Sequence, residues 1–317
     1  MAANPSLADA TEQPRYRGRF APSPTGPLHF GSLVAAVGSF LDARAQGGEW
    51  LVRIEDVDEP RSVPGAADGI LRTLEAFGFA WDGEVVVQSR RLDLYHAALS
   101  RLQLDGYVYP CACSRSEIAV ASTRASVDGG LLYPGTCRSG PGEGKAARAW
   151  RLRVPDREFH FVDRVQGASR QNLEREVGDF VLLRADGQYA YQLAVVVDDA
   201  LQGVNAVVRG VDLLDSTIRQ VWLQHCLGLP TPTYAHLPVV VNAVGEKLSK
   251  QTRAAAVDPA QASAQLTAAL RFLGHQLPSE LQGAPLADLW RWAIGAWSIT
   301  QVPAVRGIFP GGQGMGG

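Results

Sequence analysis

Residues 19–32 constrain the fold more than any other stretch of this 317-residue chain. The segment starts apolar, turns through three prolines and a glycine, and continues into a pattern with apolar residues three and four apart, which predicts an amphipathic helix. Because the first N–H groups of a helix lack partners and its dipole attracts anions, a strand, turn and helix start predict a phosphate-binding corner. His29 adds a side-chain donor, and Gly31 lets a flat group approach the backbone. A loop that packs prolines and happens to hold a histidine is the alternative.

A second segment, residues 245–251, reads Gly-Glu-Lys-Leu-Ser-Lys-Gln and follows a strand-like run at residues 237–241. Lys247 and Lys250 are three residues apart with Ser249 between them, which suits a mobile loop that closes on polyphosphate. Taken alone, such a pair of lysines is more often part of a solvated surface.

Together the two segments resemble the paired signatures of class I aminoacyl-tRNA synthetases. His29-Phe30-Gly31-Ser32 stands where that family has His-Ile-Gly-His, and residues 247–251 stand where it has Lys-Met-Ser-Lys-Ser. Residues 19–26 and Arg53-Ile54-Glu55-Asp56 resemble the glutamyl branch rather than the glutaminyl branch. The resemblance spans about residues 17–252, and it is specific because several separate motifs occur in the expected order.

The resemblance implies that ATP activates L-glutamate as an acyl-adenylate, with pyrophosphate as the leaving group. It implies catalytic roles for His29, Lys247 and Lys250. Donors, cations and Mg²⁺ would stabilise the negative charge on the phosphates. The implied ATP-binding residues are Pro22, His29, Gly31, Ser32, Lys247, Ser249 and Lys250. Ser32 replaces the second histidine of the family motif, which puts part of the turnover rate in doubt.

The implied glutamate-binding residues are Arg19, Ala21, Ser23, Glu55, Tyr191 and Arg209. Arginine suits the side-chain carboxylate because its guanidinium is a fork-shaped cation, so Arg19 and Arg209 are the candidates. Glu55 is the candidate for holding the ammonium group, and Tyr191 for donating a hydroxyl. The alternatives are a surface acidic cluster at Glu55, a core tyrosine and a salt-bridged surface arginine.

The order of predicted elements indicates an α/β fold. Strands are predicted at residues 50–55 and 85–87, and helices at residues 66–77 and 90–104. This alternation favours a doubly wound parallel sheet, the Rossmann-type sheet of class I synthetases. Further strands are predicted at residues 149–154, 158–165, 180–184 and 205–209, a hairpin turn at Asp186-Gly187, an apolar run at residues 193–197, and helices at residues 212–227, 264–273 and 287–299.

This pattern, together with what the family resemblance implies, suggests four regions. We expect a disordered tail at residues 1–16 and a catalytic domain formed by residues 17–106 and 179–252. A zinc-containing insertion of the acceptor-binding type would occupy residues 107–178, and a short helical region with a flexible end residues 253–317.

Three of the four cysteines, Cys111, Cys113 and Cys137, lie within 27 residues. Three thiolates and one more ligand would complete a tetrahedral zinc site. The arrangement resembles the zinc-binding insertion of glutamyl-type synthetases in the form whose fourth ligand is a tyrosine, here Tyr133. The site would be structural because it leaves no open position. Buried free thiols are the alternative, and Cys226 reads as a small core residue.

Composition limits the partners of the chain. Lys and Arg number 30 and Asp and Glu 32, so the net charge of −2 excludes a broadly basic nucleic-acid coat. RNA binding would need a local basic patch, for which Arg115, Arg138, Arg148 and Arg151 are candidates. No apolar run approaches the roughly 18 residues of a membrane helix. Residues 1–14 lack the apolar core of a signal peptide, so we expect a cytoplasmic protein. We also expect it to be a monomer.

The region after Arg253 has only 64 residues, too few for the anticodon-binding domain of glutamyl-tRNA synthetases. The chain therefore resembles the short paralogues of these enzymes, which activate glutamate without tRNA and transfer it to the queuosine base in the anticodon of tRNA(Asp). The expected partner is the anticodon stem-loop of that tRNA. One alternative is a shortened glutamyl-tRNA synthetase that charges a 3′ end. The others are an inactive RNA-binding or regulatory paralogue and, more remotely, a plain nucleotidyltransferase.

Overall fold

The computed structural model describes residues 15–127, 129–247 and 255–310, so Ser249 and Lys250 lie outside the described residues. Parallel strands begin the chain: β1 (Arg17–Phe20), β2 (Glu49–Ile54) and β3 (Val86–Val87) pair in that order. Helices α1 (Phe30–Arg44) and α2 (Ala66–Ala76) connect them. A second parallel pair, β9 (Ala206–Gly210) and β10 (Thr233–Leu237), is joined through α7 (Thr217–Leu227). The α/β character and the parallel pairing are thus confirmed.

Strands β1 and β9 lie beside each other. The backbone N–H of Asn205 donates to the carbonyl of Arg17 at 3.1 Å, and the Asn205 side chain accepts from the Arg17 N–H at 2.8 Å. The strands β1, β2 and β3 nevertheless form one hydrogen-bonded sheet, and β9 and β10 form another. A single doubly wound Rossmann-type sheet therefore stays a prediction.

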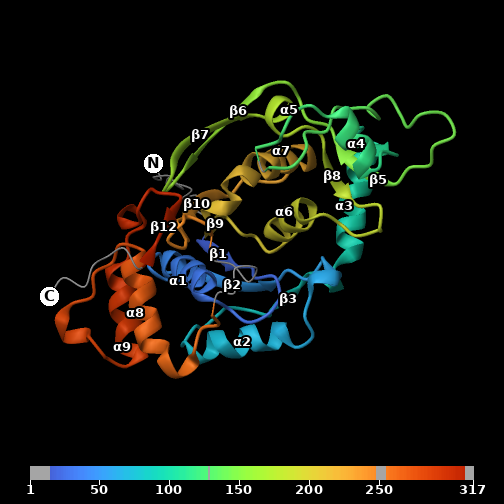
Figure 1. Cartoon of the computed structure of the whole chain (residues 1–317). Helices are drawn as coiled ribbons and strands as arrows, with labels where there is room; N and C mark the ends of the chain where they lie inside the picture. The colour runs from blue at the N-terminus through green and yellow to red at the C-terminus, as the bar shows by residue number, and fades with distance from the viewer. Residues whose placement is uncertain (1–14, 128, 248–254, 311–317) are drawn as a thin grey trace, which may run out of the picture.

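Helix α1 is the centre of the larger hydrophobic core. Phe40 on α1 makes edge contacts with the rings of Trp50, Phe79 and Trp290. Trp290 belongs to α9 (Leu286–Ala296), which packs with α8 (Ala262–Phe272) near α1, and its indole donates to the Phe77 carbonyl at 2.9 Å. Residues from the C-terminal part of the chain thus share one core with the first helix, as the α8–α9 pair beside α1 in Figure 1 shows.

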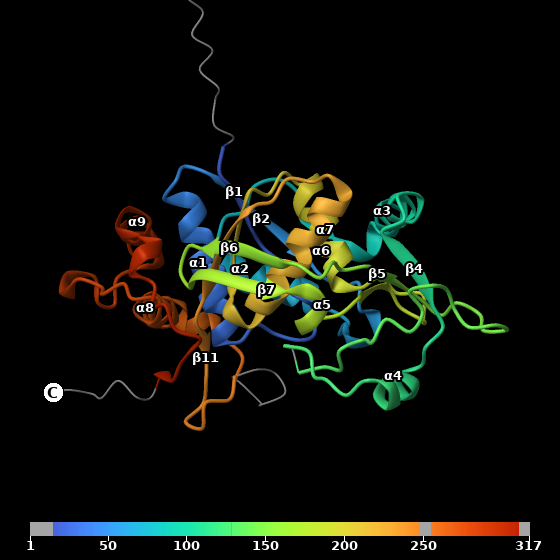
Figure 2. The same ribbon diagram turned by 90° about the horizontal axis from the view of Figure 1, so that it is seen from above.

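The opposite end of the molecule is built from antiparallel strands. Strands β4 (Val108–Cys111), β5 (Ala149–Leu152) and β8 (Phe180–Leu183) form one sheet. Helix α4 (Arg115–Ala121) follows β4 and begins with a capping box between Ser114 and Glu117. Figure 2 shows α4, β4 and β5 at one end and α8 and α9 at the other. In the sequence, helix α3 (Leu92–Leu104) precedes β4, and helix α5 (Leu173–Glu176) precedes β8.

Strands β6 (Glu158–Asp163) and β7 (Gly167–Asn172) form a hairpin that runs from this end towards β10. The backbone N–H of Arg164 donates to the carbonyl of Tyr234 at 2.9 Å, which ties the hairpin turn to β10. The sequence pattern did not predict β7, because residues 167–172 are mostly polar and lack an apolar alternation.

The apolar run at residues 193–197, for which neither strand nor helix was predicted, belongs to helix α6 (Tyr191–Leu201). A short apolar run fits a buried strand and a buried helix equally well. Two other elements differ from the sequence prediction. The strand predicted at residues 237–241 is divided between β10 and β11 (Val239–Val240), with Pro238 between them. Proline cannot donate to a ladder, which explains the break. Strand β11 pairs with β12 (Gly307–Ile308), which was not predicted.

The helix predicted at residues 212–227 begins as the 3₁₀ segment η3 (Val211–Ser216) before α7. Other 3₁₀ turns are η1 (Glu59–Arg61), η2 (Gln88–Arg90), η5 (Pro259–Gln261), η6 (Ser279–Leu281) and η7 (Ile299–Gln301). None of the helices in the described ranges is both long and apolar enough to cross a membrane.

Candidate functional site

A cavity of about 920 Å³ opens where β1, β9 and β10 end and α1 begins. Eleven residues predicted from the two sequence motifs and the glutamyl resemblance line this one cavity. They are Arg19, Ala21, Pro22, Ser23, His29, Gly31, Ser32, Glu55, Tyr191, Arg209 and Lys247. The carboxyl ends of parallel strands are the usual place for ligands in α/β proteins, and Glu55 directly follows β2 in this way.

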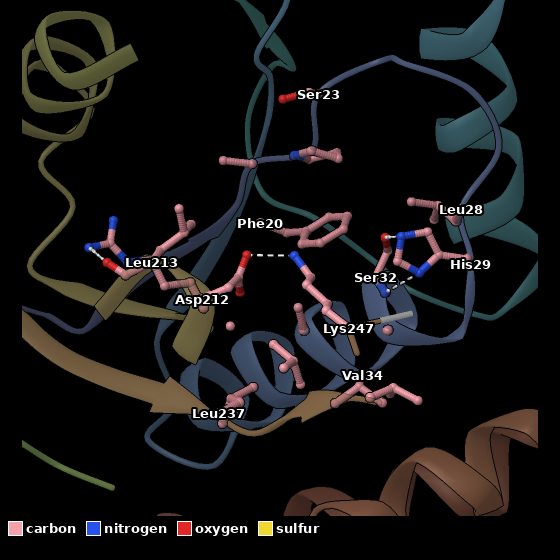
Figure 3. Close-up of a pocket in the computed structure, with 18 of the residues that line it drawn as sticks. Phe20, Ser23, Leu28, His29, Ser32, Val34, Asp212, Leu213, Leu237 and Lys247 are labelled. Carbon is pink, nitrogen blue, oxygen red and sulfur yellow. Dashed lines mark hydrogen bonds and ion pairs between the residues drawn. The ribbon is translucent and has the colours of Figure 1, made fainter. Parts of the chain in front are cut away.

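His29 caps the first turn of α1. Its Nδ1 accepts from the backbone N–H of Ser32 at 3.3 Å, and its Nε2 lies 3.2 Å from the Ser32 hydroxyl, as the two dashed lines in Figure 3 show. With Nδ1 as acceptor, a neutral ring carries its proton on Nε2, so His29 can donate from that atom. Ser32, the residue that departs from the family motif, therefore contacts the histidine of that motif directly.

Lys247 crosses the cavity towards β9 and the turn that follows it. Its Nζ lies 2.6 Å from Oδ2 of Asp212, and both side chains remain partly exposed. Figure 3 shows the lysine between Asp212 on one side and His29 with Ser32 on the other. The structure thus brings Lys247 to the end of α1 that carries His29, although 217 residues separate them in the sequence.

Arg19 and Glu55, which line the cavity, belong to a buried network of four charged groups. Arg53 donates to Asp199 at 2.7 Å and to Glu55 at 3.1 Å, and Arg19 donates to Asp199 at 3.2 Å. Burial opposes ionisation of Asp199, but Arg19 and Arg53 outweigh it and hold its pKa below the usual range. Burial raises the pKa of Glu55 against the opposing effect of Arg53 and Arg19. Two cations and two carboxyl groups thus largely balance one another.

Arg209 differs from Arg19 and Arg53 because its partners are uncharged groups. Its Nε donates to His236 at 3.0 Å, and one terminal nitrogen donates to Gln220 at 2.8 Å. The other donates to the Thr217 hydroxyl at 2.9 Å and to the Leu213 carbonyl at 3.3 Å. No described carboxylate forms an ion pair with Arg209, which is 5% exposed and lines the cavity. The cavity therefore offers an uncompensated positive charge to an anionic ligand.

Tyr191 is the first residue of α6 and also lines the cavity. Burial raises the pKa of its phenol, so the hydroxyl keeps its proton at neutral pH and can donate a hydrogen bond. Its neighbour Gln192 contacts Gln220, which in turn holds Arg209. Tyr191 and Arg209 are therefore parts of one connected wall.

The sequence reasoning missed the acidic partners of this site. The sequence pattern singled out neither Asp199, which follows the apolar run at residues 193–197, nor Asp163. A charged pair such as Asp198-Asp199 inside an apolar segment is a usable signal, because buried carboxylates need partners. Asp198 indeed accepts hydrogen bonds from Gln88, Arg91 and Tyr95.

The cysteine cluster lies away from this cavity, and its first member, Cys111, is the last residue of β4. The sulfur atoms of Cys111, Cys113 and Cys137 all lie within 4.8 Å of one another. The Tyr133 hydroxyl lies 3.4 Å from the Cys111 sulfur and 3.6 Å from that of Cys113. Sulfurs around a tetrahedral zinc would be roughly 3.8 Å apart, given Zn–S bonds of about 2.3 Å. The donor set therefore fits a zinc ion, while Cys226 packs in a separate hydrophobic core, as expected.

Two of the four arginines suggested for RNA contact have partners inside the protein. Arg138 is paired with Asp179 and Glu174, and the Arg151 guanidinium stacks over the Tyr133 ring at 3.9 Å. These partners indicate structural roles for both residues. Arg115 and Arg148 are exposed and remain candidates for contact with RNA.

The comparisons with known proteins place the chain in a family. The family model for the catalytic domain of class I tRNA synthetases (E and Q) matches residues 15–270. The glutamyl-Q tRNA(Asp) synthetase of Dechloromonas aromatica is 66% identical over 91% of this chain and 96% of its own length. The protein of the same name from Aromatoleum aromaticum is 61% identical over 92% and 91%, respectively.

A solved structure shares the fold. The glutamate-tRNA synthetase of Elizabethkingia anophelis superposes with a TM-score of 0.76 at 26% identity, covering 93% of this chain and 68% of that one. The sequence identity to the relatives, the match to the family model and the shared fold all indicate the same family. The chain therefore belongs to the class I aminoacyl-tRNA synthetases of the glutamyl and glutaminyl type and, within them, to the glutamyl-Q tRNA(Asp) synthetase family.

Proposed function

We propose that the protein is a ligase that activates L-glutamate with ATP and transfers it to the queuosine base in the anticodon of tRNA(Asp). The observation that carries this proposal is the 66% identity, over nine-tenths of the chain, to a relative named for this reaction. The cavity supports it, because those of the residues implied for ATP and for glutamate that the structure describes line the same space.

The ATP side of the cavity would be formed by Pro22, Gly31 and Ser32 together with His29 and Lys247. His29 and the start of α1 suit the α-phosphate, since donors there meet the charge that develops as the carboxylate attacks. Lys247, Ser249 and Lys250 would hold the departing pyrophosphate. When ATP binds, Nζ of Lys247 would leave Oδ2 of Asp212, which lies 2.6 Å away, and contact phosphate oxygens instead.

The glutamate side would be formed by Arg19, Ala21 and Ser23 together with Glu55, Tyr191 and Arg209. Arg209 suits the side-chain carboxylate because no described carboxylate neutralises it. The carboxyl group of Glu55 would face the ammonium group, and the Tyr191 hydroxyl would donate to the substrate. The division into residues 17–106 with 179–252 as catalytic domain, 107–178 as insertion and 253–317 as C-terminal region belongs to the same proposal.

This activity predicts pyrophosphate–ATP exchange with glutamate alone. Exchange should occur without tRNA, because the proposed ATP and glutamate groups come from this chain. His29→Ala and Lys250→Ala should each lower the rate by about 10²-fold or more, as expected for the loss of a group that stabilises the transition state. The measurement is the incorporation of labelled pyrophosphate into ATP in the presence of glutamate. Glutamine in place of glutamate serves as the control. Wild-type exchange no faster than that of Lys250→Ala would contradict the prediction.

The cysteine cluster predicts one structural zinc ion per chain, held by Cys111, Cys113, Tyr133 and Cys137. Backbone and side-chain hydrogen bonds, acting against burial, lower the pKa of Cys137 to about 7, which favours the thiolate that zinc requires. Elemental analysis of protein purified without added metal should find zinc in wild type and lose it in Cys113→Ala. Cys226→Ala is the matched control and should keep the full complement. Wild type without zinc, or Cys113→Ala with a full complement, would exclude the site.

A further inference from the structure

Two buried residues behind the cavity hold Arg209 in place. His236 on β10 has no solvent exposure, and its Nε2 accepts from Nε of Arg209 at 3.0 Å. On the other side of the ring, Nδ1 lies 2.6 Å from Oδ2 of Asp163, the last residue of β6. Asp163, His236 and Arg209 thus form a chain of hydrogen bonds from the hairpin to the cavity. Only Arg209 among the three lines the cavity.

The orientation of the Asp163 carboxylate is fixed by its other oxygen. Oδ1 accepts from the backbone N–H groups of Val165, Gln166 and His236, at 3.0, 2.9 and 3.0 Å. These three donors require an acceptor at the Oδ1 position. Burial acts to raise the pKa of Asp163, but hydrogen bonds from the His236 side chain and from the backbone N–H groups of Gln166 and His236 lower it. Oδ2 is therefore left to face His236 as an ionised oxygen.

This arrangement determines the tautomer of His236. An ionised carboxylate only accepts hydrogen bonds, so Nδ1 of His236 carries the proton and Nε2 offers its lone pair. That lone pair accepts from Arg209, whose guanidinium can only donate. Burial and the nearby Arg209 lower the pKa of His236 more than Asp163 raises it, which keeps the ring neutral.

We propose that Asp163 and His236 are positioning residues for Arg209, and that they aim its guanidinium at the carboxylate of the substrate by fixing the His236 tautomer. The inference rests on the proposed function, in which Arg209 binds glutamate. Gln220 and Thr217 hold the terminal nitrogens, but His236 is the acceptor at Nε and so sets the plane of the guanidinium. Arg209 needs such a neutral acceptor, because a carboxylate in contact with it would compete with the substrate.

Asp163→Asn tests the proposal with almost no change in shape. The three backbone donors keep the amide oxygen at the Oδ1 position, so the NH₂ group faces Nδ1 of His236. Nδ1 must then accept, the proton moves to Nε2, and two N–H groups face each other between His236 and Arg209. The Thr217 hydroxyl, 3.2 Å from Nε2, can accept that proton, but Nε of Arg209 loses its acceptor.

We expect Asp163→Asn to raise the KM for glutamate by about 10- to 100-fold, the range found when a residue that orients a metal ligand is lost. The KM for ATP should stay within about twofold, because His29 and Lys247 are untouched. Asp156→Asn is the matched control. This exposed carboxylate accepts from Asn172 and Arg175 near the same hairpin, and its loss should change neither constant.

Nitrogen NMR of protein labelled in histidine gives a readout independent of glutamate. His236 should be protonated at Nδ1 in wild type and at Nε2 in Asp163→Asn. A wild-type ring protonated at Nε2 would overturn the proposal. A KM for glutamate of Asp163→Asn equal to that of Asp156→Asn would also overturn it. Equal increases of the KM for glutamate and ATP would indicate a merely structural role and also overturn it. Failure of wild type to activate glutamate would instead refute the proposed function, while the NMR result still decides the tautomer.

Discussion

Replacing Arg209 by methionine is expected to lower kcat/KM for glutamate in pyrophosphate exchange by at least about 30-fold. Methionine retains most of the side-chain volume but removes the cation that no described carboxylate neutralises. Truncating one partner of a buried charge pair costs roughly 2–5 kcal/mol, which corresponds to this loss or a larger one. Arg209→Lys should recover only part of the activity, because an ammonium group cannot reproduce the fork of the guanidinium that meets His236, Gln220 and Thr217.

The KM for ATP and the melting temperature separate this effect from general damage. Arg101→Met removes an exposed arginine that pairs with Asp105 on the surface of α3, so it should leave kcat/KM unchanged. Arg209→Met with a native-like melting temperature and the glutamate kinetics of Arg101→Met would refute the role given to Arg209. An equal decrease of kcat/KM for glutamate and for ATP in Arg209→Met would also refute it.

The parts of the site that the sequence predicted are those that depend on local geometry. His29 and Ser32 follow a strand and a proline-rich turn, so their place at the start of α1 could be inferred from the pattern. Lys247 was recognised only through the family motif, since a lysine pair alone is a weak signal. The cysteine cluster could be inferred from spacing, because thiols close in sequence and separated by a loop can meet without knowledge of the fold.

The parts that the sequence did not predict depend on contacts between distant segments. Arg19 meets Asp199 across 180 residues, and His236 meets Asp163 across 73. No local pattern shows which carboxylate a buried arginine will find, because the pairing is decided by how strands and helices pack. The same limit explains β7 and β12, which are defined by their partners rather than by their own apolar periodicity.

Transfer to RNA is the step that distinguishes this proposal from a shortened glutamyl-tRNA synthetase. The curated relatives at 55–66% identity are named for glutamyl-Q and tRNA(Asp). A single-stranded loop can turn a base outwards for stacking and edge contacts, so an anticodon loop can present a modified base to an active site. Arg115 and Arg148 are exposed on the part of the chain that carries the cysteine cluster, and we propose them as contacts for phosphates of the RNA.

The most direct test of this account uses two isolated anticodon stem-loops of tRNA(Asp), identical except that one carries queuosine and the other guanosine. The protein is incubated with labelled glutamate and ATP, and the label recovered with each RNA is measured. We predict stable labelling of the queuosine stem-loop and none of the guanosine stem-loop, although neither has a tRNA 3′ end. Equal labelling of both stem-loops would contradict the proposal. Labelling only of intact tRNA at its 3′ end, in a parallel incubation, would contradict it as well and favour a shortened glutamyl-tRNA synthetase.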